Sequence, residues 1–332
     1  MGSFSARDPD EIGVAVLGAG RMGRTHLANL AAIPHARVVV VADPDPDAAE
    51  TGRSLGRAQR ASTDPASAIH DEDVEAVVIV TPTNTHASFI EEALRAGKAI
   101  WTEKPIAGDL AETTRIVELW RELDVPLQVG FMRRFDPGYV RAKELISSGE
   151  LGRIEQFRAY SRDTLPPPIE FLLASGGSFL DMSVHDLDLA RFLVGEVEEV
   201  QAWATVLFDE RFAKADDWDT SVAMLRFRNG ALGVVETARH SAWGYDIRTE
   251  VAGATGKVVV DEGDGFESFT DRFEVAYRRE LECFFDDLAG GRTPSPGPED
   301  ALLTLRLAVA CTTSWREGRA VRLDEVPGAQ GG

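Results

Sequence analysis

A glycine-rich turn is the feature that most constrains how this chain can fold. Gly18, Gly20 and Gly23 follow directly on the apolar run Ile12–Leu17, and a helical pattern begins within the turn. In this context the first glycine permits a tight turn and the second lets a bound group approach the backbone, while the third allows close packing of helix against strand. The N-terminus of such a helix favours negative charge. We therefore expect a strand, an anion-binding turn and a helix at the start of an α/β domain.

Apolar runs rich in β-branched residues alternate with helical patterns over the first part of the chain. In chain order the runs are IGVAVL, RVVVVA, AVVIV, KAIWT and PLQVGF. Strands that alternate with helices are typical of a parallel sheet with crossover helices. Together with the glycine turn, this alternation predicts a doubly wound Rossmann domain over residues 12–130.

The pattern changes after about residue 131. A helical pattern at Tyr139–Ile146 precedes longer runs with hairpin-like breaks, notably at Asn229-Gly230, which favour a large, mostly antiparallel open sheet. We expect an α+β domain over residues 131–325. Its expected strands are Val197–Phe208, Ser221–Phe227, Ala231–Ala238 and Arg248–Val251, and its long helices are Asp271–Leu288 and Pro298–Glu317.

Length and charge agree with two domains and limit the partners. A chain of 332 residues with 44% apolar residues can fill two cores. Its formal net charge of -20 disfavours nucleic acid and anionic lipid as partners, because both bind clustered Lys and Arg.

No apolar run suits a membrane-spanning helix and the N-terminus lacks a signal pattern, so we expect a cytoplasmic protein with no membrane partner. Cys283 and Cys311 lack metal-binding spacing and are expected to be reduced and buried.

The residue that follows the second apolar run indicates the cofactor. Asp43 lies 20 residues beyond Gly23, where a carboxylate can accept hydrogen bonds from both ribose hydroxyls of a dinucleotide and repels a 2′-phosphate. Pro44 and Asp45 supply no cation for such a phosphate. The sequence therefore favours NAD over NADP. The competing interpretation is an Asp43 that only caps a helix beside an unoccupied crevice.

Polar residues after the run AVVIV are expected beside the same cofactor. Thr81, Pro82 and Asn84 follow this strand, and ligands of such sheets bind beyond the carboxyl ends of the strands. Thr83 and Asn84 fit helix capping equally well, and His86 fits a structural histidine better than a catalyst. The full set of expected cofactor residues is Gly18, Gly20, Arg21, Met22, Gly23, Asp43, Thr81, Pro82, Asn84, His86, Glu103 and Lys104.

A lysine is expected at the same edge of the sheet. The tripeptide Glu103-Lys104-Pro105 follows the run KAIWT. An ammonium group there can hydrogen-bond a reacting hydroxyl and stabilise the alkoxide that develops as hydride leaves. Taken alone, the tripeptide fits a surface lysine better. Because Lys104 can act as the electrophile, no metal is expected, and the 6 histidines show no HxxxH spacing.

The segment from Gly176 to Asp188 carries the most telling catalytic pattern. Asp181, His185 and Asp188 are spaced so that one helix starting early enough would place them on one face. Histidine can take the proton of a hydroxyl near neutral pH. We expect His185 to be the base and Asp181 to orient its ring or contact a substrate hydroxyl, whereas Asp188 only caps or solvates the helix. The competing interpretation is a buried histidine satisfied by a local aspartate.

These residues resemble the glucose-fructose oxidoreductase and inositol dehydrogenase superfamily (Gfo/Idh/MocA) over nearly the whole chain. The motifs that carry the resemblance are GAGRMGRTH, TPTNTH, EKPIAGDL, VGFMRRFDPGY, GGSFLDMSVHDLDLARFL and GALGVVETARHSAWGYDIRTEV. VGFMRRFDPGY and the segment ending in GYDIR look similar to inositol 2-dehydrogenases. The resemblance implies that Lys104, Asp181 and His185 form a catalytic triad. The substrate contacts that we expect are Lys104, Met132, Arg133, Asp163, Asp181, His185 and Tyr245.

The resemblance implies an NAD-dependent oxidoreductase that oxidises a secondary hydroxyl of a cyclic polyol, with myo-inositol to 2-keto-inositol as the first candidate. One departure concerns the isomer. Where some inositol dehydrogenases carry His and Asn, this chain has Ser161-Arg162-Asp163, which changes the groups that face the ring. Scyllo-inositol, chiro-inositol, another sugar or an anhydrosugar such as levoglucosan remain open, as does a non-catalytic NAD-binding regulatory protein. The resemblance also implies a homotetramer, with a homodimer as the alternative.

Overall fold

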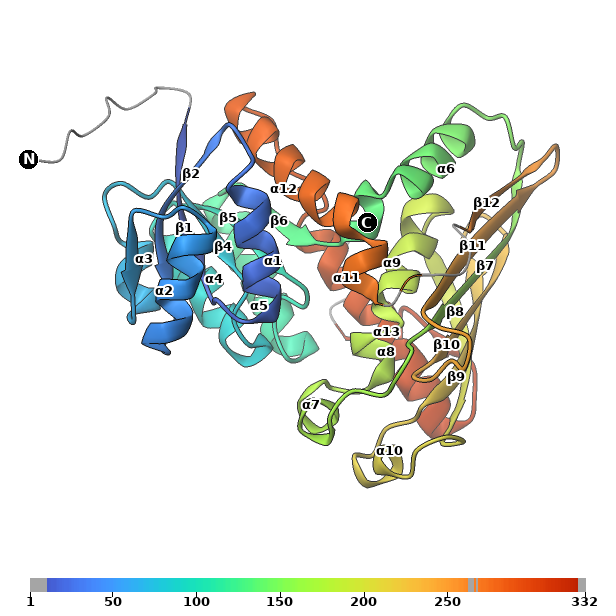
Figure 1. Cartoon of the computed structure of the whole chain (residues 1–332). Helices are drawn as coiled ribbons and strands as arrows, with labels where there is room; N and C mark the ends of the chain where they lie inside the picture. Colours follow the sequence, from blue (N-terminus) through green and yellow to red (C-terminus); the bar gives the residue numbers. More distant parts are fainter. Residues whose placement is uncertain (1–10, 262–265, 267, 328–332) are drawn as a thin grey trace, which may run out of the picture. The chain divides into compact units, whose positions relative to one another are not determined.

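The computed structural model describes residues 11–261, 266 and 268–327 (Figure 1). The chain forms two compact units, each made of segments that are distant in the sequence. The first unit consists of residues 11–107, Glu112–Gly130 and Tyr277–Ala301, and the second of Gly108–Ala111, Phe131–Ala276 and residues 302–327. The segment Tyr277–Ala301, which the sequence pattern places in the second domain, thus belongs to the first unit.

The first unit contains a sheet of six parallel strands. Their order is β3-β2-β1-β4-β5-β6, and each neighbouring pair is parallel. This order reverses between β1 and β4, as in a doubly wound dinucleotide-binding fold. The strands are β1 (Ile12–Leu17), β2 (Ala36–Ala42), β3 (Arg60–Ser62), β4 (Ala76–Ile79), β5 (Ala99–Glu103) and β6 (Leu127–Gly130).

Helices connect these strands in sequence. They are α1 (Arg21–Leu30), α2 (Pro46–Leu55), α3 (Pro65–Ile69), the short 3₁₀ turn η1 (Thr83–Thr85), α4 (His86–Arg95) and α5 (Leu110–Leu123). A helix from much later in the chain, α12 (Glu274–Ala289), packs in the same core. The core consists of buried valines of β1, β2 and β4 with residues of α1 and α12. Trp101 of β5 and Leu281, Phe284 and Phe285 of α12 are fully buried in it. Apolar burial therefore fastens α12 to the first unit.

The second unit contains a seven-stranded mixed sheet. The order is β12-β11-β7-β10-β9-β8-β13, in which only the β7–β10 pair is parallel. The mostly antiparallel sheet expected from the sequence is confirmed. The strands are β7 (Ile154–Arg162), β8 (Val197–Thr205), β9 (Thr220–Phe227), β10 (Leu232–Ala238), β11 (Asp246–Gly253), β12 (Lys257–Asp261) and β13 (Val321–Arg322).

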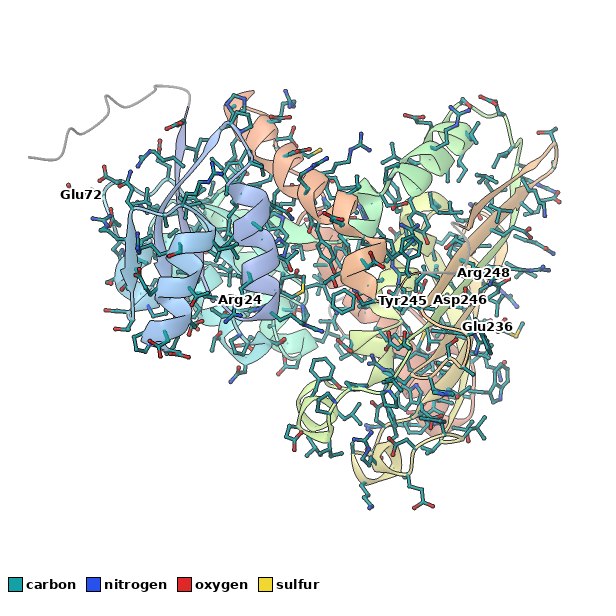
Figure 2. The ribbon with its side chains drawn as sticks, in the orientation of Figure 1. Arg24, Glu72, Glu236, Tyr245, Asp246 and Arg248 are labelled. Carbon is teal, nitrogen blue, oxygen red and sulfur yellow. The ribbon has the colours of Figure 1, made fainter. Side chains whose placement is uncertain are left out.

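Helices cover one face of this sheet and leave the other face open (Figure 1). Glu236 of β10 and Arg248 of β11 both pair with Tyr160 of β7, so the three share the open face (Figure 2). The helical elements of this unit are η2 (Met132–Phe135), α6 (Pro137–Ser147), α7 (Ile169–Ala174), α8 (Ser178–Asp181), α9 (Val184–Leu193), α10 (Arg211–Lys214), α11 (Phe269–Arg272) and most of α13 (Pro298–Glu317).

Three local expectations from the sequence are corrected. The edge strand β3 was not expected, and the helix expected at Asp271–Leu288 is divided into α11 and α12 at Phe273. Cys283 is exposed rather than buried, whereas Cys311 is buried and neither forms a disulfide. None of the helices in the described part of the chain has the length and apolar character needed to cross a membrane.

Candidate active site

The glycine turn of the first unit meets the requirements of an anion-binding turn. Gly18 has a φ of +98°, and a Cβ there would lie 2.6 Å from the carbonyl oxygen of Val80. A Cβ on Gly23 would lie 2.2 Å from the carbonyl oxygen of Gly18, so helix and turn are in direct contact. A Cβ on Gly20, in contrast, would have no atom within 4 Å. Packing within the protein therefore explains why positions 18 and 23 are glycine. The glycine at position 20 instead leaves the space beside the backbone open to a ligand.

The N-terminus of α1 is left without a side-chain cap. Gly20 occupies the N-cap position, and the first turn of α1 contains no acidic residue. Helix N-termini carry backbone N–H groups that lack partners within the helix and a partial positive charge. The residues at this end thus fit the diphosphate of a dinucleotide, with Arg21 and Met22 in the first turn.

Asp43 follows β2 and lies against the glycine turn. Its Oδ2 accepts a hydrogen bond of 2.8 Å from the backbone N–H of Ala19, and its Oδ1 accepts one of 3.0 Å from Asp45. A carboxylate has about four acceptor positions, so each oxygen can still accept a hydroxyl. Asp43 does not cap a helix, because the N-cap of α2 is Asp45, whose side chain accepts from the N–H of Asp47.

The segment after β4 is fixed by its own polar groups. The Thr85 hydroxyl donates to the carbonyl oxygen of Pro82 at 2.8 Å, and its oxygen lies 2.7 Å from the Thr81 hydroxyl, within hydrogen-bond distance. The ring of His86 is buried, with Nε2 2.8 Å from the Thr81 carbonyl oxygen and Nδ1 2.7 Å from that of Pro105. These contacts favour the structural interpretation of His86, and they link the loop after β4 to the loop after β5. Asn84 is exposed in η1.

Lys104 follows directly on β5, at the carboxyl edge of the parallel sheet. The same edge carries the glycine turn after β1 and Asp43 after β2, because all these strands run in one direction. Glu103 is held by the buried His26 of α1, whose Nε2 lies 2.9 Å from a carboxylate oxygen. The structure therefore brings the candidates of the first unit to one sheet edge, as expected from the strand order.

In the second unit, two candidate carboxylates share one arginine. The guanidinium group of Arg239 donates through Nη2 to Oδ2 of Asp181 at 2.6 Å and through Nη1 to Oδ2 of Asp163 at 3.1 Å. Burial raises the pKa of Asp163, and the charge of Arg239 opposes this rise. For Arg239, burial lowers the pKa, but the charges of Asp181 and Asp163 outweigh it and raise the pKa overall. Arg239 was not among the residues expected from the sequence.

His185 and Asp181 do not belong to one continuous helix. Asp181 ends α8 and α9 begins at Val184, and Met182 and Ser183 between them keep right-handed helical backbone angles. His185 lies in the first turn of α9, half-buried, with its ring edge-on to Phe131 at a centroid distance of 6.4 Å. Asp181 and His185 thus come from two successive helices of the second unit.

The expectation that Asp188 only caps or solvates the helix is wrong. Its carboxylate is 1% exposed and accepts two hydrogen bonds from the guanidinium group of Arg134, at 2.7 and 2.8 Å. The hydroxyl of Thr304 in α13 donates a third, at 3.3 Å. Asp188 is thus half of a buried ion pair that ties α9 to η2 and α13.

Arg133 is part of a buried polar network, and Tyr245 is buried in the same unit. Arg133 donates to Asp186 at 2.6 Å and to the Ser161 hydroxyl at 3.2 Å, and Ser161 donates to the second oxygen of Asp186 at 2.6 Å. The adjacent Met132 is buried as well. Tyr245, next to the start of β11 in Figure 2, is 8% exposed, and burial raises the pKa of its phenol. Arg133 is thus held by Asp186 of α9, whereas Arg239 is held by Asp163 and Asp181.

The candidates fall into two groups by unit. The cofactor candidates, Glu103 and Lys104 included, belong to the first unit, whereas Asp163, Asp181, His185, Met132, Arg133 and Tyr245 belong to the second. Among the described residues, no group of three or more His, Cys, Asp or Glu side chains is arranged to hold a metal ion. Arg239 and Asp186 are the site residues that sequence analysis missed. A usable signal for Arg239 was its place directly after an expected strand.

Comparisons with known proteins agree with this division. A family model described as an oxidoreductase family with an NAD-binding Rossmann fold matches residues 12–131, and a GFO/IDH/MocA C-terminal domain model matches residues 139–259. The myo-inositol 2-dehydrogenase of Thermotoga maritima is 37% identical, with 95% of this chain and 99% of the relative covered. The scyllo-inositol 2-dehydrogenase (NAD(+)) of Bacillus subtilis is 39% identical, with 95% and 97% covered.

A solved structure shows the same fold over the whole chain. The crystal structure of a probable dehydrogenase from Thermotoga maritima superposes with a TM-score of 0.91 at 37% identity, covering 95% of this chain and 100% of that one. The expected cofactor, NAD, and the expected enzyme class are confirmed by the matching family model and by the NAD-dependent relative. The chain therefore belongs to the GFO/IDH/MocA family of oxidoreductases, and its first unit is an NAD-binding Rossmann domain.

Proposed function

We propose that this protein is an NAD-dependent dehydrogenase that oxidises a secondary hydroxyl of a cyclic polyol, with myo-inositol, oxidised to 2-keto-inositol, as the first substrate. The observation that carries the proposal is the pair of carboxylates, Asp163 and Asp181, held by Arg239 in the unit that also contains His185. Neighbouring carboxylates are suited to accept hydrogen bonds from neighbouring hydroxyls. The names of the two inositol dehydrogenase relatives support the same substrate class.

The first unit would hold the cofactor through its sheet edge. The N-terminus of α1 and the open side of Gly20 would receive the diphosphate, and Asp43 would accept from the ribose hydroxyls. Thr81, Pro82 and Asn84 would line the same edge. When bound, NAD⁺ supplies the acceptor for the hydride that leaves the carbinol carbon.

We assign the proton chemistry to three side chains. His185 would take the proton from the reacting hydroxyl, and the ammonium group of Lys104 would stabilise the negative charge that develops on its oxygen. Asp181 would accept a hydrogen bond from a neighbouring hydroxyl and thereby orient the ring. The oxidised carbon loses a hydride and its oxygen loses a proton, which leaves a ketone.

Scyllo-inositol is the second candidate substrate. Asp163 stands in the position where some inositol dehydrogenases carry a different polar residue, and the Bacillus subtilis relative is named for the scyllo isomer. Isomers of inositol differ only in the direction of hydroxyls, so one acceptor that is moved or exchanged can change the preference strongly.

We also propose that the protein acts in the cytoplasm as a homotetramer, with a homodimer as the alternative. Both cysteines are unpaired, which suits a reducing compartment. The open face of the second unit's sheet exposes Trp203, Met224, Leu232 and Val259, each about half exposed, at 49–56%. A sheet face that exposes several large apolar side chains is typical of a contact between protein chains.

The proposed function is tested by NAD reduction with myo-, scyllo- and chiro-inositol, glucose and levoglucosan as substrates. We expect turnover of at least one inositol, and His185→Ala should lower kcat by about 100-fold or more without changing NAD affinity. The control is His70→Ala, because the side chain of His70 is 60% exposed and pairs with Glu92 on the surface of the first unit. Tight NAD binding without turnover of any cyclic polyol would instead indicate a regulatory protein.

A further inference from the structure

The parallel pair in the second sheet brings two functional side chains together. Strands β7 and β10 run side by side in register, with Arg162 opposite Ala238. The next residues are Asp163 and Arg239, and the N–H of Asp163 donates to the carbonyl oxygen of Ala238 at 3.0 Å. Arg239 is anchored as well, since its N–H donates to the carbonyl oxygen of Asp219 at 2.8 Å. Both side chains therefore start from fixed backbone positions.

The three charged groups are not equally accessible. The side chain of Arg239 is 6% exposed, whereas those of Asp163 and Asp181 are 26% and 19% exposed. The guanidinium group thus lies behind the carboxylates, and the carboxylates face outward. An ion pair whose only role was packing would have no need to leave its carboxylates partly exposed to solvent.

One arginine cannot neutralise two carboxylates. When both acids are ionised, Arg239 and these two carboxylates sum to one negative charge, and without Arg239 the two acids would repel each other at short range. The planar guanidinium group has donors on two separate nitrogens, so it can hold two carboxylates at a fixed spacing. A lysine, which carries a single compact charge, cannot impose this geometry.

We propose that Arg239 is a positioning and specificity residue that holds Asp163 and Asp181 as paired acceptors for two neighbouring hydroxyls of a neutral polyol. The remaining negative charge disfavours substrates that carry a carboxylate at that end, such as a hexuronate, and those that carry a phosphate. This inference rests on the proposed function and names the substrate class more closely, as a neutral ring with adjacent hydroxyls.

The test compares Arg239→Gln, Arg239→Lys and Asp163→Asn in the full chain, with inositol and glucuronate as substrates. We expect Arg239→Gln to raise the KM for the best inositol about tenfold or more and to leave the KM for NAD within about twofold. Arg239→Lys should recover only part of this loss. Asp163→Asn should raise the KM for inositol with little change in kcat, and should raise the activity ratio of glucuronate to inositol.

The control is Arg191→Gln, which removes another buried arginine of the same unit. Arg191 pairs with Glu196 and Thr304 near the end of α9, so its loss should lower thermal stability and leave the KM for inositol unchanged. Should Arg239→Gln fail to fold, the double variant with Asp163→Asn removes the repulsion, and Asp163→Asn alone still tests the claim.

The outcomes separate this inference from the proposed function. A wild-type protein inert with every inositol overturns the proposed function. A wild-type protein that turns over inositol, with Asp163→Asn and the Arg239 variants unchanged in KM and in selectivity, overturns the inference alone. An equal rise of KM in Arg191→Gln also overturns it, because the effect would then be general loosening of the unit.

Discussion

Asp43 accepts hydrogen bonds from its own chain in addition to those that we propose it accepts from the ribose of NAD. Because its oxygens accept from the N–H groups of Ala19 and Asp45, it shapes the turn that would receive the diphosphate. Asp43→Asn removes the negative charge and keeps one acceptor oxygen. We expect the Kd for NADH to rise about tenfold, from the loss of charge-assisted hydrogen bonds, and the Kd for NADPH to rise less, since the repulsion of its 2′-phosphate is relieved.

Fluorescence titration with both reduced cofactors measures this change of preference. The control is Asp45→Asn, because asparagine caps a helix as well as aspartate does and the α2 cap should be preserved. An unchanged ratio of the two affinities in Asp43→Asn would show that the carboxylate does not select the cofactor.

Sequence patterns identified residues at strand ends and missed those whose partners are distant in the chain. The glycine turn, Asp43 and Lys104 were predictable because each follows a recognisable apolar strand. Arg239 was missed because its partners, Asp163 and Asp181, are 76 and 58 residues away. Asp188 was misjudged for the same reason, since Arg134 lies 54 residues before it.

At the scale of elements, α12 places an acid where no cation pairs with it. Glu280 is fully buried in the first unit, and neither carboxylate oxygen has a hydrogen-bond partner among the described residues. Burial raises the pKa of Glu280 well above its ordinary value, and the charge of Glu103 raises it further. Glu103 is itself paired with His26, whose Nε2 lies 2.9 Å from a carboxylate oxygen.

The raised pKa predicts a loss of stability with rising pH. Below about pH 4.3 Glu280 is protonated in both states, and its contribution is fully present. As pH rises toward the folded-state pKa, the unfolded chain ionises first and stability falls. Glu280→Gln cannot ionise, so its free energy of unfolding should exceed that of the wild type by an amount that grows by up to about 1.4 kcal/mol per pH unit.

Thermal unfolding at several pH values between about 5 and 7 tests this prediction. The matched control is Glu282→Gln on the same helix, whose side chain is 40% exposed and pairs with Arg278. Parallel pH dependence in the wild type and Glu280→Gln would mean that Glu280 is ionised in the folded protein.

The type of each helix or strand was largely predictable from the sequence, but the unit against which a helix packs was not. Helix α13 has the bounds that the pattern predicted, Pro298–Glu317. The apolar side of α12 was equally visible, yet an amphipathic pattern does not say which core it fills, and Leu281, Phe284 and Phe285 fill that of the first unit. Strand β3 was missed because its three residues, Arg-Ala-Ser, carry no apolar alternation.

For the whole molecule, the open sheet face of the second unit determines the expected assembly. Its apolar side chains include Trp203 and Met224, each 52% exposed, on adjacent strands β8 and β9. We expect light scattering after size exclusion to give a mass of two or four chains. Trp203→Glu together with Met224→Glu should shift the protein toward the monomer, because burying these charges in an apolar contact costs several kcal/mol.

The control is Leu207→Glu, because Leu207 lies outside the strands and is 75% exposed. A wild-type protein that is monomeric at all concentrations would refute the assembly, and a double variant of unchanged mass would place the contact on another face.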